Sequence, residues 1–232
     1  MIADAGPALV DAVRMNVETS NMLRILKSGL GMLALAAAMA AQADPALEHA
    51  KKLLDRAILF DGHNDLPWAI REHPVAAGDL AKYDLTTRAP EKGQTDIPRL
   101  RAGKVGAQFW SVYTPPEATG HHARTQLEQI DLMRRIIAQH PETFALCSTA
   151  ADIRAAKAAG RIGSMLGIEG GHTIEDSLAA LRMYYALGVR YMTLTHNRHT
   201  NWADAGLEDP PLHDGLSAFG EEVVREMNRL GM

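Results

Sequence analysis

Short apolar runs and longer amphipathic segments alternate along most of the chain. Residues 122–140 are helical in type, because their apolar side chains recur three and four positions apart and leave Arg and Gln on the opposite face. Similar helical patterns cover residues 46–56, 149–159, 174–187 and 215–230. Four short runs have the length and composition of strands: residues 57–61, 105–113, 162–168 and 189–195. Strands that alternate with helices predict a parallel sheet.

The apolar runs end abruptly in polar residues. His63 and Asp65 follow the first run, Glu169 follows the third and His196 follows the fourth. In a β/α barrel the C-terminal ends of the strands meet at one face, where the catalytic groups lie. No Gly-x-Gly-x-x-Gly turn follows a run, which argues against a dinucleotide-binding fold. We therefore predict the α/β class, with four β/α units that form the N-terminal half of a TIM-type (β/α)8 barrel.

The length of the chain sets the number of barrel strands that we expect. A complete barrel takes about 250 residues and eight strands. Residues 44–232 supply four predicted strands, and the sequence stops after a helix, where a fifth strand would begin. We expect this segment to be the N-terminal portion of a longer barrel domain. Its first run, Ile-Leu-Phe at 58–60, is expected to be a strand buried on both faces, because parallel strands of this kind are continuously apolar.

Three of the strand-end residues have the chemistry of metal ligands. His63 and Asp65 stand two positions apart, so on a strand both would point to one side and offer nitrogen and oxygen to zinc. Glu169 precedes two glycines that would clear space for an ion, and its two oxygens could bridge two ions. Each signal has a structural alternative, since His63 and Asp65 also fit a surface turn and Glu169 also fits a helix cap.

Other polar and aromatic residues near the strand ends are less specific. His196 would face the same edge, either as a metal ligand or as a hydrogen-bond donor to substrate. Trp68 and Trp202 either pack beneath the loops or form an aromatic wall for a substrate. His172 and His199 are interpreted as ordinary polar loop residues.

The N-terminal segment has the layout of a secretory signal peptide. Arg24 and Lys27 precede an apolar run at 29–41, and Ala-Gln-Ala at 41–43 fits the small-x-small cleavage pattern. The alternative is a buried Ala-rich helix. Met15 and Met22 both fit a start of translation, so the first residues are interpreted as a start-site extension. We assign residues 1–43 to these two segments and expect export to the periplasm or the extracellular space.

Composition excludes some classes of function. The formal net charge of −4 gives no electrostatic reason to expect a nucleic-acid partner. Cys147 is the only cysteine, so the chain has no internal disulfide and no cysteine-based metal cluster. We expect Cys147 to be a small apolar side chain near a strand or loop.

Four sequence blocks, taken together, resemble the membrane dipeptidase (renal dipeptidase) family of zinc peptidases. The blocks are DGHNDLPW at 61–68, GAQFWSVY at 106–113, IEGGH at 168–172 and LTHN at 194–197. Their order and spacing match the family over about residues 48–232. Four blocks in the right order are far more specific than any one of them.

The resemblance implies a β/α barrel with two zinc ions that hydrolyses dipeptides, including those with a C-terminal D-residue. It implies that His63 and Asp65 bind one ion and that Glu169 bridges both. It also implies that His196 binds substrate and that Trp68 lies near it. The family takes two further histidine ligands from strands five and six, which the four predicted strands do not include, so the second zinc site is expected to be incomplete. A homodimer is expected from the resemblance alone, and membrane anchoring is left open.

Two other hypotheses compete with an exported zinc dipeptidase. In the first, the 232-residue chain is an inactive half-barrel fragment with weak metal binding. In the second, the chain is a different barrel amidohydrolase that acts on cyclic amides. A His-x-His after the first strand would favour the amidohydrolase, and the His-Asn-Asp at 63–65 does not.

Overall fold

The computed structural model describes residues 44–88, 93–117 and 121–232, so the predicted signal segment lies outside the described residues. The chain divides into two units, residues 1–53 and 54–232. In the first unit the described residues form most of α2 (Pro45–Arg56), the helix expected at 46–56. No helix among the described residues is both long enough and apolar enough to cross a membrane.

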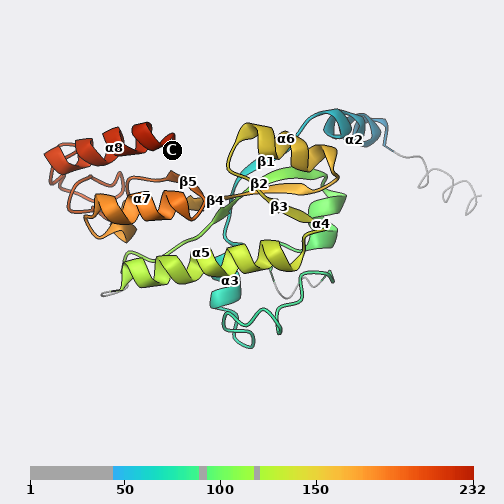
Figure 1. Ribbon diagram of the computed structural model, residues 1–232, viewed down its shortest axis with the longest axis horizontal. Coiled ribbons are helices and arrows are strands. Elements are labelled where there is room, and N and C mark those ends of the chain that lie inside the picture. The colour runs from blue at the N-terminus through green and yellow to red at the C-terminus, as the bar shows by residue number, and fades with distance from the viewer. Residues whose placement is uncertain (1–43, 89–92, 118–120) are drawn as a thin grey trace, which may run out of the picture. The chain divides into compact units, whose positions relative to one another are not determined.

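The second unit is built on a parallel sheet, which confirms the predicted fold class (Figure 1). The strands are β1 (Leu59–Asn64), β2 (Val105–Ser111), β3 (Phe144–Leu146), β4 (Ile162–Ile168) and β5 (Val189–Met192). The order is β1-β2-β4-β3, and β5 also pairs with β4. On the side away from β2, β4 therefore pairs with β3 along its first half and with β5 along its second half. The sheet is open, as in part of a barrel.

The count of four strands was wrong, because β3 is a fifth. It has three residues, Phe144–Leu146, and pairs only with the start of β4. A segment of three residues is too short to show a period of two, so the pattern of polar and apolar positions could not reveal it. The other four strands lie close to the predicted runs.

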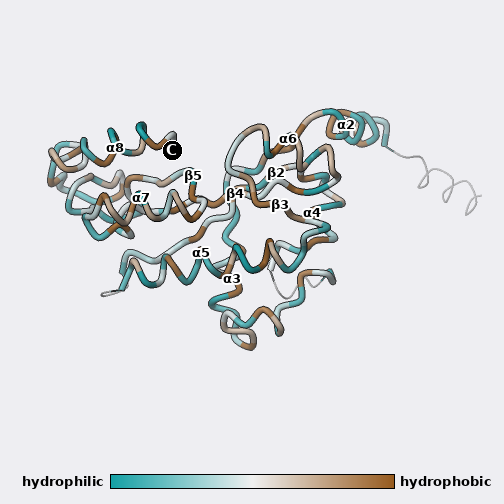
Figure 2. Tube along the Cα trace, viewed as in Figure 1, coloured by the Kyte–Doolittle hydropathy of each residue, from teal (hydrophilic) through white to brown (hydrophobic). Residues whose placement is uncertain are grey.

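Helices cover both faces of the sheet (Figure 1). α6 (Ala150–Ala158) packs on β2 and β4 on one face, while α3 (Leu66–Arg71) and α5 (His122–Gln139) lie on the other. Hydrophilic and hydrophobic segments alternate along α5 (Figure 2), as the predicted amphipathic pattern requires. The larger core includes Trp110, Ile130, Met133, Phe144 and Leu166, and the smaller core under α6 includes Ala107, Cys147, Ile153 and Met165.

Several helix boundaries differ from the predicted ones for local reasons. The predicted helix at 174–187 is divided into a short 3₁₀ helix, η2 (Gly171–Ile174), and α7 (Leu178–Ala186), since Glu175 and Asp176 between them have positive φ angles of 47° and 56°. α8 (Ala218–Leu230) starts three residues later than predicted, at the cap Ser217. Two short helices, α3 and α4 (Ile97–Ala102), lie at the two ends of the otherwise irregular stretch between β1 and β2.

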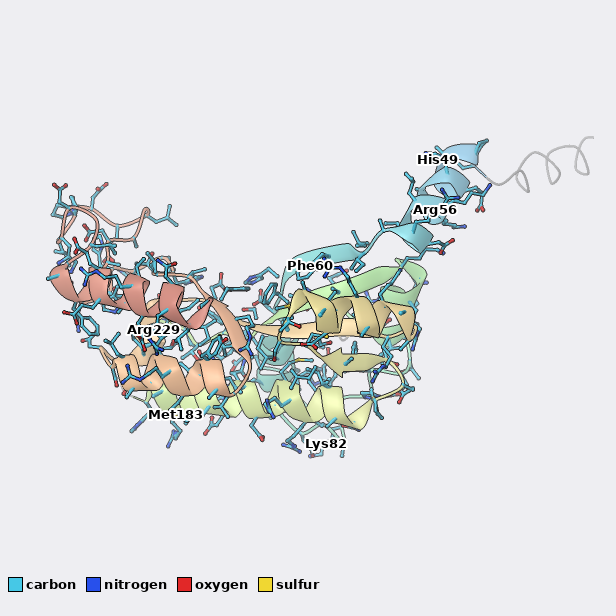
Figure 3. All side chains as sticks on the ribbon, turned by 45° about the horizontal axis from the view of Figure 1, so that its top comes forward. His49, Arg56, Phe60, Lys82, Met183 and Arg229 are labelled. Atoms are coloured by element: carbon cyan, nitrogen blue, oxygen red, sulfur yellow. The ribbon has the colours of Figure 1, made fainter. Side chains whose placement is uncertain are left out.

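Strand β1 is exposed, which corrects the expectation of a strand buried on both faces. Leu59 and Phe60 keep 38% and 42% of their surface accessible. Among the described residues β1 pairs only with β2, so it lies at the end of the sheet. Figure 3 shows Phe60 on this end strand. The Phe60 ring contacts Phe109 of β2, with 5.5 Å between centroids, but no second layer covers it within the described part of the chain.

The start of α6 is closed by a capping box, as the pairing of Thr149 with Asp152 predicts. The Thr149 hydroxyl accepts the Asp152 N–H at 3.2 Å, and the Asp152 carboxylate accepts the Thr149 N–H at 2.9 Å. We expect Thr149→Ala to lower the free energy of unfolding by about 1 kcal/mol, because one helical N–H loses its acceptor. Thr149→Ser is the matched control, since it keeps the hydroxyl. Urea denaturation that gave equal losses for both variants would contradict this role.

Candidate metal centre

A bulge at the end of β1 sets the direction of His63. Asp61 pairs with Gln108 and Asn64 pairs with Trp110, so three steps along β1 correspond to two along β2. The extra residue falls at Gly62 or His63. Such bulges bend a strand and re-aim its side chains. His63 therefore does not follow the regular alternation on which the prediction for this strand was based.

Asp65 lies beyond the strand, as the residue before α3, with φ −87° and ψ 27°. The two side chains still meet: His63 Nε2 is 3.1 Å from Asp65 Oδ1 and 3.2 Å from Oδ2. The reason given for this proximity, two positions on one face of a strand, was therefore wrong. The bulge and the first turn of α3 bring the imidazole and the carboxylate together instead.

Glu169 reaches the same place from the C-terminal end of β4. Its Oε2 lies 3.5 Å from His63 Nε2, and its Oε1 lies 3.6 Å from His196 Nε2. The loop after Glu169 is fixed by the Gly170 N–H, which donates to the Thr193 hydroxyl at 2.7 Å. Strand ends that are distant in sequence thus place one carboxylate between two imidazoles.

These groups fit a zinc ion. One ligand atom from each of His63, Asp65 and Glu169 lies within 4.8 Å of the others. Among the described residues, Asp65 and Glu169 form ion pairs only with histidines, so no arginine or lysine neutralises the two carboxylates. One imidazole and two carboxylates form a ligand set that zinc accepts, and three protein ligands leave a position open for water or substrate. His63 and Asp65 are exposed, so the cluster can be reached from solvent.

Tyr191 is a neighbour of this cluster that sequence reasoning missed. Its hydroxyl lies 3.2 Å from His63 Nδ1, on the side of the ring away from the carboxylates. Burial raises the pKa of Tyr191 to about 12, and the charges of Glu169 and Asp65 act in the same direction, so the phenol stays neutral. Tyr191 stands opposite Gly167 in the sheet. The pairing of Tyr191 with Gly167 is the signal that would have revealed this neighbour, and the sequence does not show which residues of two strands pair.

Aromatic rings line one side of the cluster. Trp68 contacts Tyr113 edge to face, with 5.2 Å between ring centroids, and Tyr113 lies 5.2 Å from the His196 ring. Burial, followed by the charges of Glu117 and Glu169, raises the pKa of Tyr113, which therefore remains a neutral hydrogen-bonding group. Trp68 is half-buried. These three rings contact one another in series and end at His196, beside Glu169.

The two glycines after Glu169 make room for side chains rather than for an ion, contrary to expectation. A Cβ at Gly170 would come within 2.3 Å of the His172 ring, and one at Gly171 within 2.4 Å of the Trp202 ring. Trp202 is completely buried, so the packing interpretation applies to it. His172 Nε2 donates to the Thr114 carbonyl at 2.9 Å, and burial lowers its pKa to about 4. His172 thus acts as a neutral link between two loops.

His199 also has a structural role. Its Nδ1 accepts the Ala205 N–H at 2.9 Å within the loop that carries Trp202.

A cavity of about 360 Å³ opens beside the metal cluster. Its lining includes His63 and Asp65, together with Tyr83 and Thr95. A cavity of this size is in the range of small-molecule sites.

A match to a known family decides the identity of the chain. The sequence pattern of the membrane dipeptidase family, peptidase family M19, matches residues 47–232. The chain belongs to this family. It is 42% identical to dipeptidase aclJ of Aspergillus oryzae over 191 residues and 44% identical to dipeptidase 3 of Mus musculus over 195 residues. These matches cover 78% and 82% of this chain but 45% and 38% of the relatives, so it spans less than half of their length.

Solved structures show the same fold. The probable dipeptidase PvdM from Pseudomonas aeruginosa has a TM-score of 0.69 at 20% identity, covering 82% of this chain and 49% of that one. A metallopeptidase from Rhodobacter sphaeroides, liganded with a phosphinate mimic of the dipeptide L-Ala-D-Ala, has a TM-score of 0.60 at 22% identity, covering 75% and 56%. Membrane dipeptidases of family M19 are metallopeptidases, and His63, Asp65 and Glu169 form the candidate metal site of this member.

Proposed function

We propose that this chain carries the metal-binding part of a zinc-dependent dipeptidase. The observation that supports it is the convergence of His63, Asp65 and Glu169, from two distant strand ends, in a member of a dipeptidase family. His63 and Asp65 would hold one ion, and Glu169 would be shared with a second. Zinc ions bound there would supply an activated water and polarise the peptide carbonyl.

The surrounding residues would bind and orient the dipeptide. His196 Nδ1 lies 2.9 Å from Asn197 Oδ1, so Nδ1 carries a proton and Nε2 is the nitrogen that faces Glu169. A hydrogen bond from this side chain would stabilise the carbonyl oxygen of the substrate, where negative charge develops. Trp68 and Tyr113 would exclude water from one side of the peptide, because their rings contact each other and the ring of His196.

We further propose that the substrates include dipeptides with a C-terminal D-residue. Support comes from the Rhodobacter sphaeroides relative, whose ligand mimics L-Ala-D-Ala. We also propose export, guided by the predicted signal segment, and a homodimer, as the family resemblance implies. The dipeptide is the proposed partner, and the formal net charge of −4 gives no support for a nucleic acid.

A non-catalytic polypeptide is the second candidate. Within the described residues only three side chains converge as ligands, which is few for two ions, and the sheet that holds them is open. In that case residues 44–232 would bind fewer than two zinc ions and hydrolyse no dipeptide. The open sheet would also hold the ligands less firmly, because its end strand β1 is supported by one neighbour only.

One experiment distinguishes these candidates. Zinc content by elemental analysis is measured on the purified product of the gene, beside hydrolysis of L-Ala-D-Ala and L-Ala-L-Ala. Two ions per chain with turnover of either dipeptide support the dipeptidase, and turnover of L-Ala-D-Ala supports the proposed D-residue specificity. Fewer than two ions without turnover support the non-catalytic polypeptide. A protein that binds no zinc would exclude the proposed metal centre altogether.

A further inference from the structure

Tyr191 occupies a fixed place behind the metal cluster. It lies on β5 directly opposite Gly167 of β4, two residues before Glu169. A Cβ at Gly167 would lie 2.1 Å from the Tyr191 ring, so only glycine leaves room for this ring. Phe109 of β2 contacts the same ring, with 4.8 Å between centroids. Because β2, β4 and β5 together confine the ring, its hydroxyl has little freedom to leave His63.

The two nitrogens of His63 face different partners. Nε2 faces Asp65 at 3.1 Å and Glu169 at 3.5 Å, while Nδ1 lies 3.2 Å from the Tyr191 hydroxyl. Among the described residues this hydroxyl is the hydrogen-bond partner of Nδ1, so it fixes the rotation of the ring from the side opposite the carboxylates.

A phenol suits this position, because its hydroxyl can both donate and accept a hydrogen bond, whereas carboxylates and backbone carbonyls can only accept. The Tyr191 hydroxyl can therefore keep its contact with Nδ1 whichever ring nitrogen carries the proton.

We propose that Tyr191 is a positioning residue of the zinc centre, which holds the His63 ring in the orientation that turns Nε2 toward Asp65 and Glu169. This inference rests on the proposed zinc function. Tyr191 lies outside the proposed ligand set. The proposal also explains why residue 167 is a glycine, because a side chain there would occupy the space of the Tyr191 ring beside His63.

Tyr191→Phe tests the proposal, because it keeps the ring that fills the space beside Gly167 and removes only the oxygen. We expect zinc affinity, measured by competition with a chromophoric chelator, to fall about 10- to 100-fold, the usual effect of losing the partner of a ligand histidine. Tyr184→Phe is the matched control. Tyr184 is also a buried tyrosine, but its hydroxyl donates to the Thr173 carbonyl and does not touch His63. This control is expected to lower the melting temperature and to leave zinc affinity unchanged.

A second measurement needs no metal. In the metal-free protein, the imidazole ¹⁵N chemical shifts of His63 report which nitrogen carries the proton, and Tyr191→Phe is expected to shift the Nδ1 resonance of His63 but not the resonances of His213. Wild-type zinc affinity in Tyr191→Phe would overturn the proposal and leave the dipeptidase function standing. Unchanged His63 shifts would also overturn it. Absence of zinc binding in the wild-type protein would instead mean that the proposed function itself fails.

Discussion

Replacement of Glu169 by glutamine is expected to lower both zinc affinity and dipeptide hydrolysis by about 100-fold or more. The magnitude follows because loss of an outer-shell partner already costs about 10- to 100-fold, and Glu169 is a proposed ligand. Glutamine has the same shape, so the expected loss reflects the missing negative charge between His63 and His196. Elemental analysis of zinc and a dipeptide hydrolysis assay measure the two effects.

Glu175→Gln is the matched control for this result. Glu175 lies in the same stretch after β4, and its Oε1 accepts the Ala123 N–H at 3.1 Å, an interaction that a glutamine oxygen can keep. It belongs to no metal cluster of the described residues. We expect full zinc content and full activity in this variant. Equal losses of zinc affinity and activity in both variants would show that any negative charge in this stretch has the same effect. Glu169 would then not be a metal ligand.

Replacement of Trp202 by alanine is expected to lower the free energy of unfolding by about 3–5 kcal/mol, because it leaves a cavity the size of an indole ring in the core. The Trp202 side chain is completely buried, and its ring fills the space above Gly171. Its backbone carbonyl also accepts the Ser217 N–H at the start of α8. Urea denaturation measures the change.

Trp68→Ala provides the comparison, since Trp68 follows a different strand end and is only half-buried. Its loss should cost clearly less stability than the loss of Trp202, and it should raise the KM for dipeptides, because Trp68 borders the proposed substrate surface. A small loss of stability in Trp202→Ala, or an equal loss in both variants, would show that the packing of Trp202 has been misjudged.

The parts of the fold that could be predicted from the sequence are those with a strong local pattern. The apolar face of α5 and the capping box at Thr149 are visible because each depends on residues three or four positions apart. Strand ends marked by His63 and Glu169 could be identified for the same reason: an apolar run stops at a polar residue. His196 lies beyond the end of β5 at Met192. In each of these cases neighbours in sequence carry the information.

Features that depend on pairing between strands could not be predicted. The bulge at the end of β1 exists only in the register between β1 and β2, and it changed the argument for His63 and Asp65. Tyr191 meets His63 because β5 pairs with β4 opposite Gly167. Gly170 and Gly171 are required because the rings of His172 and Trp202 pack against them, and these contacts exist only in the folded chain. The exposure of β1 is likewise a property of the whole sheet.

The bulge in β1 has a consequence for self-association. An end strand with exposed apolar side chains offers unpaired N–H and C=O groups to the same strand of another molecule, and this is a common route to aggregation. The pairing of β1 with β2 shifts register between Leu59 and Phe60 and again between Asp61 and Asn64, so the even spacing that a partner strand would need is interrupted. The irregularity that turns His63 toward Asp65 therefore also shortens the template available for intermolecular strand pairing.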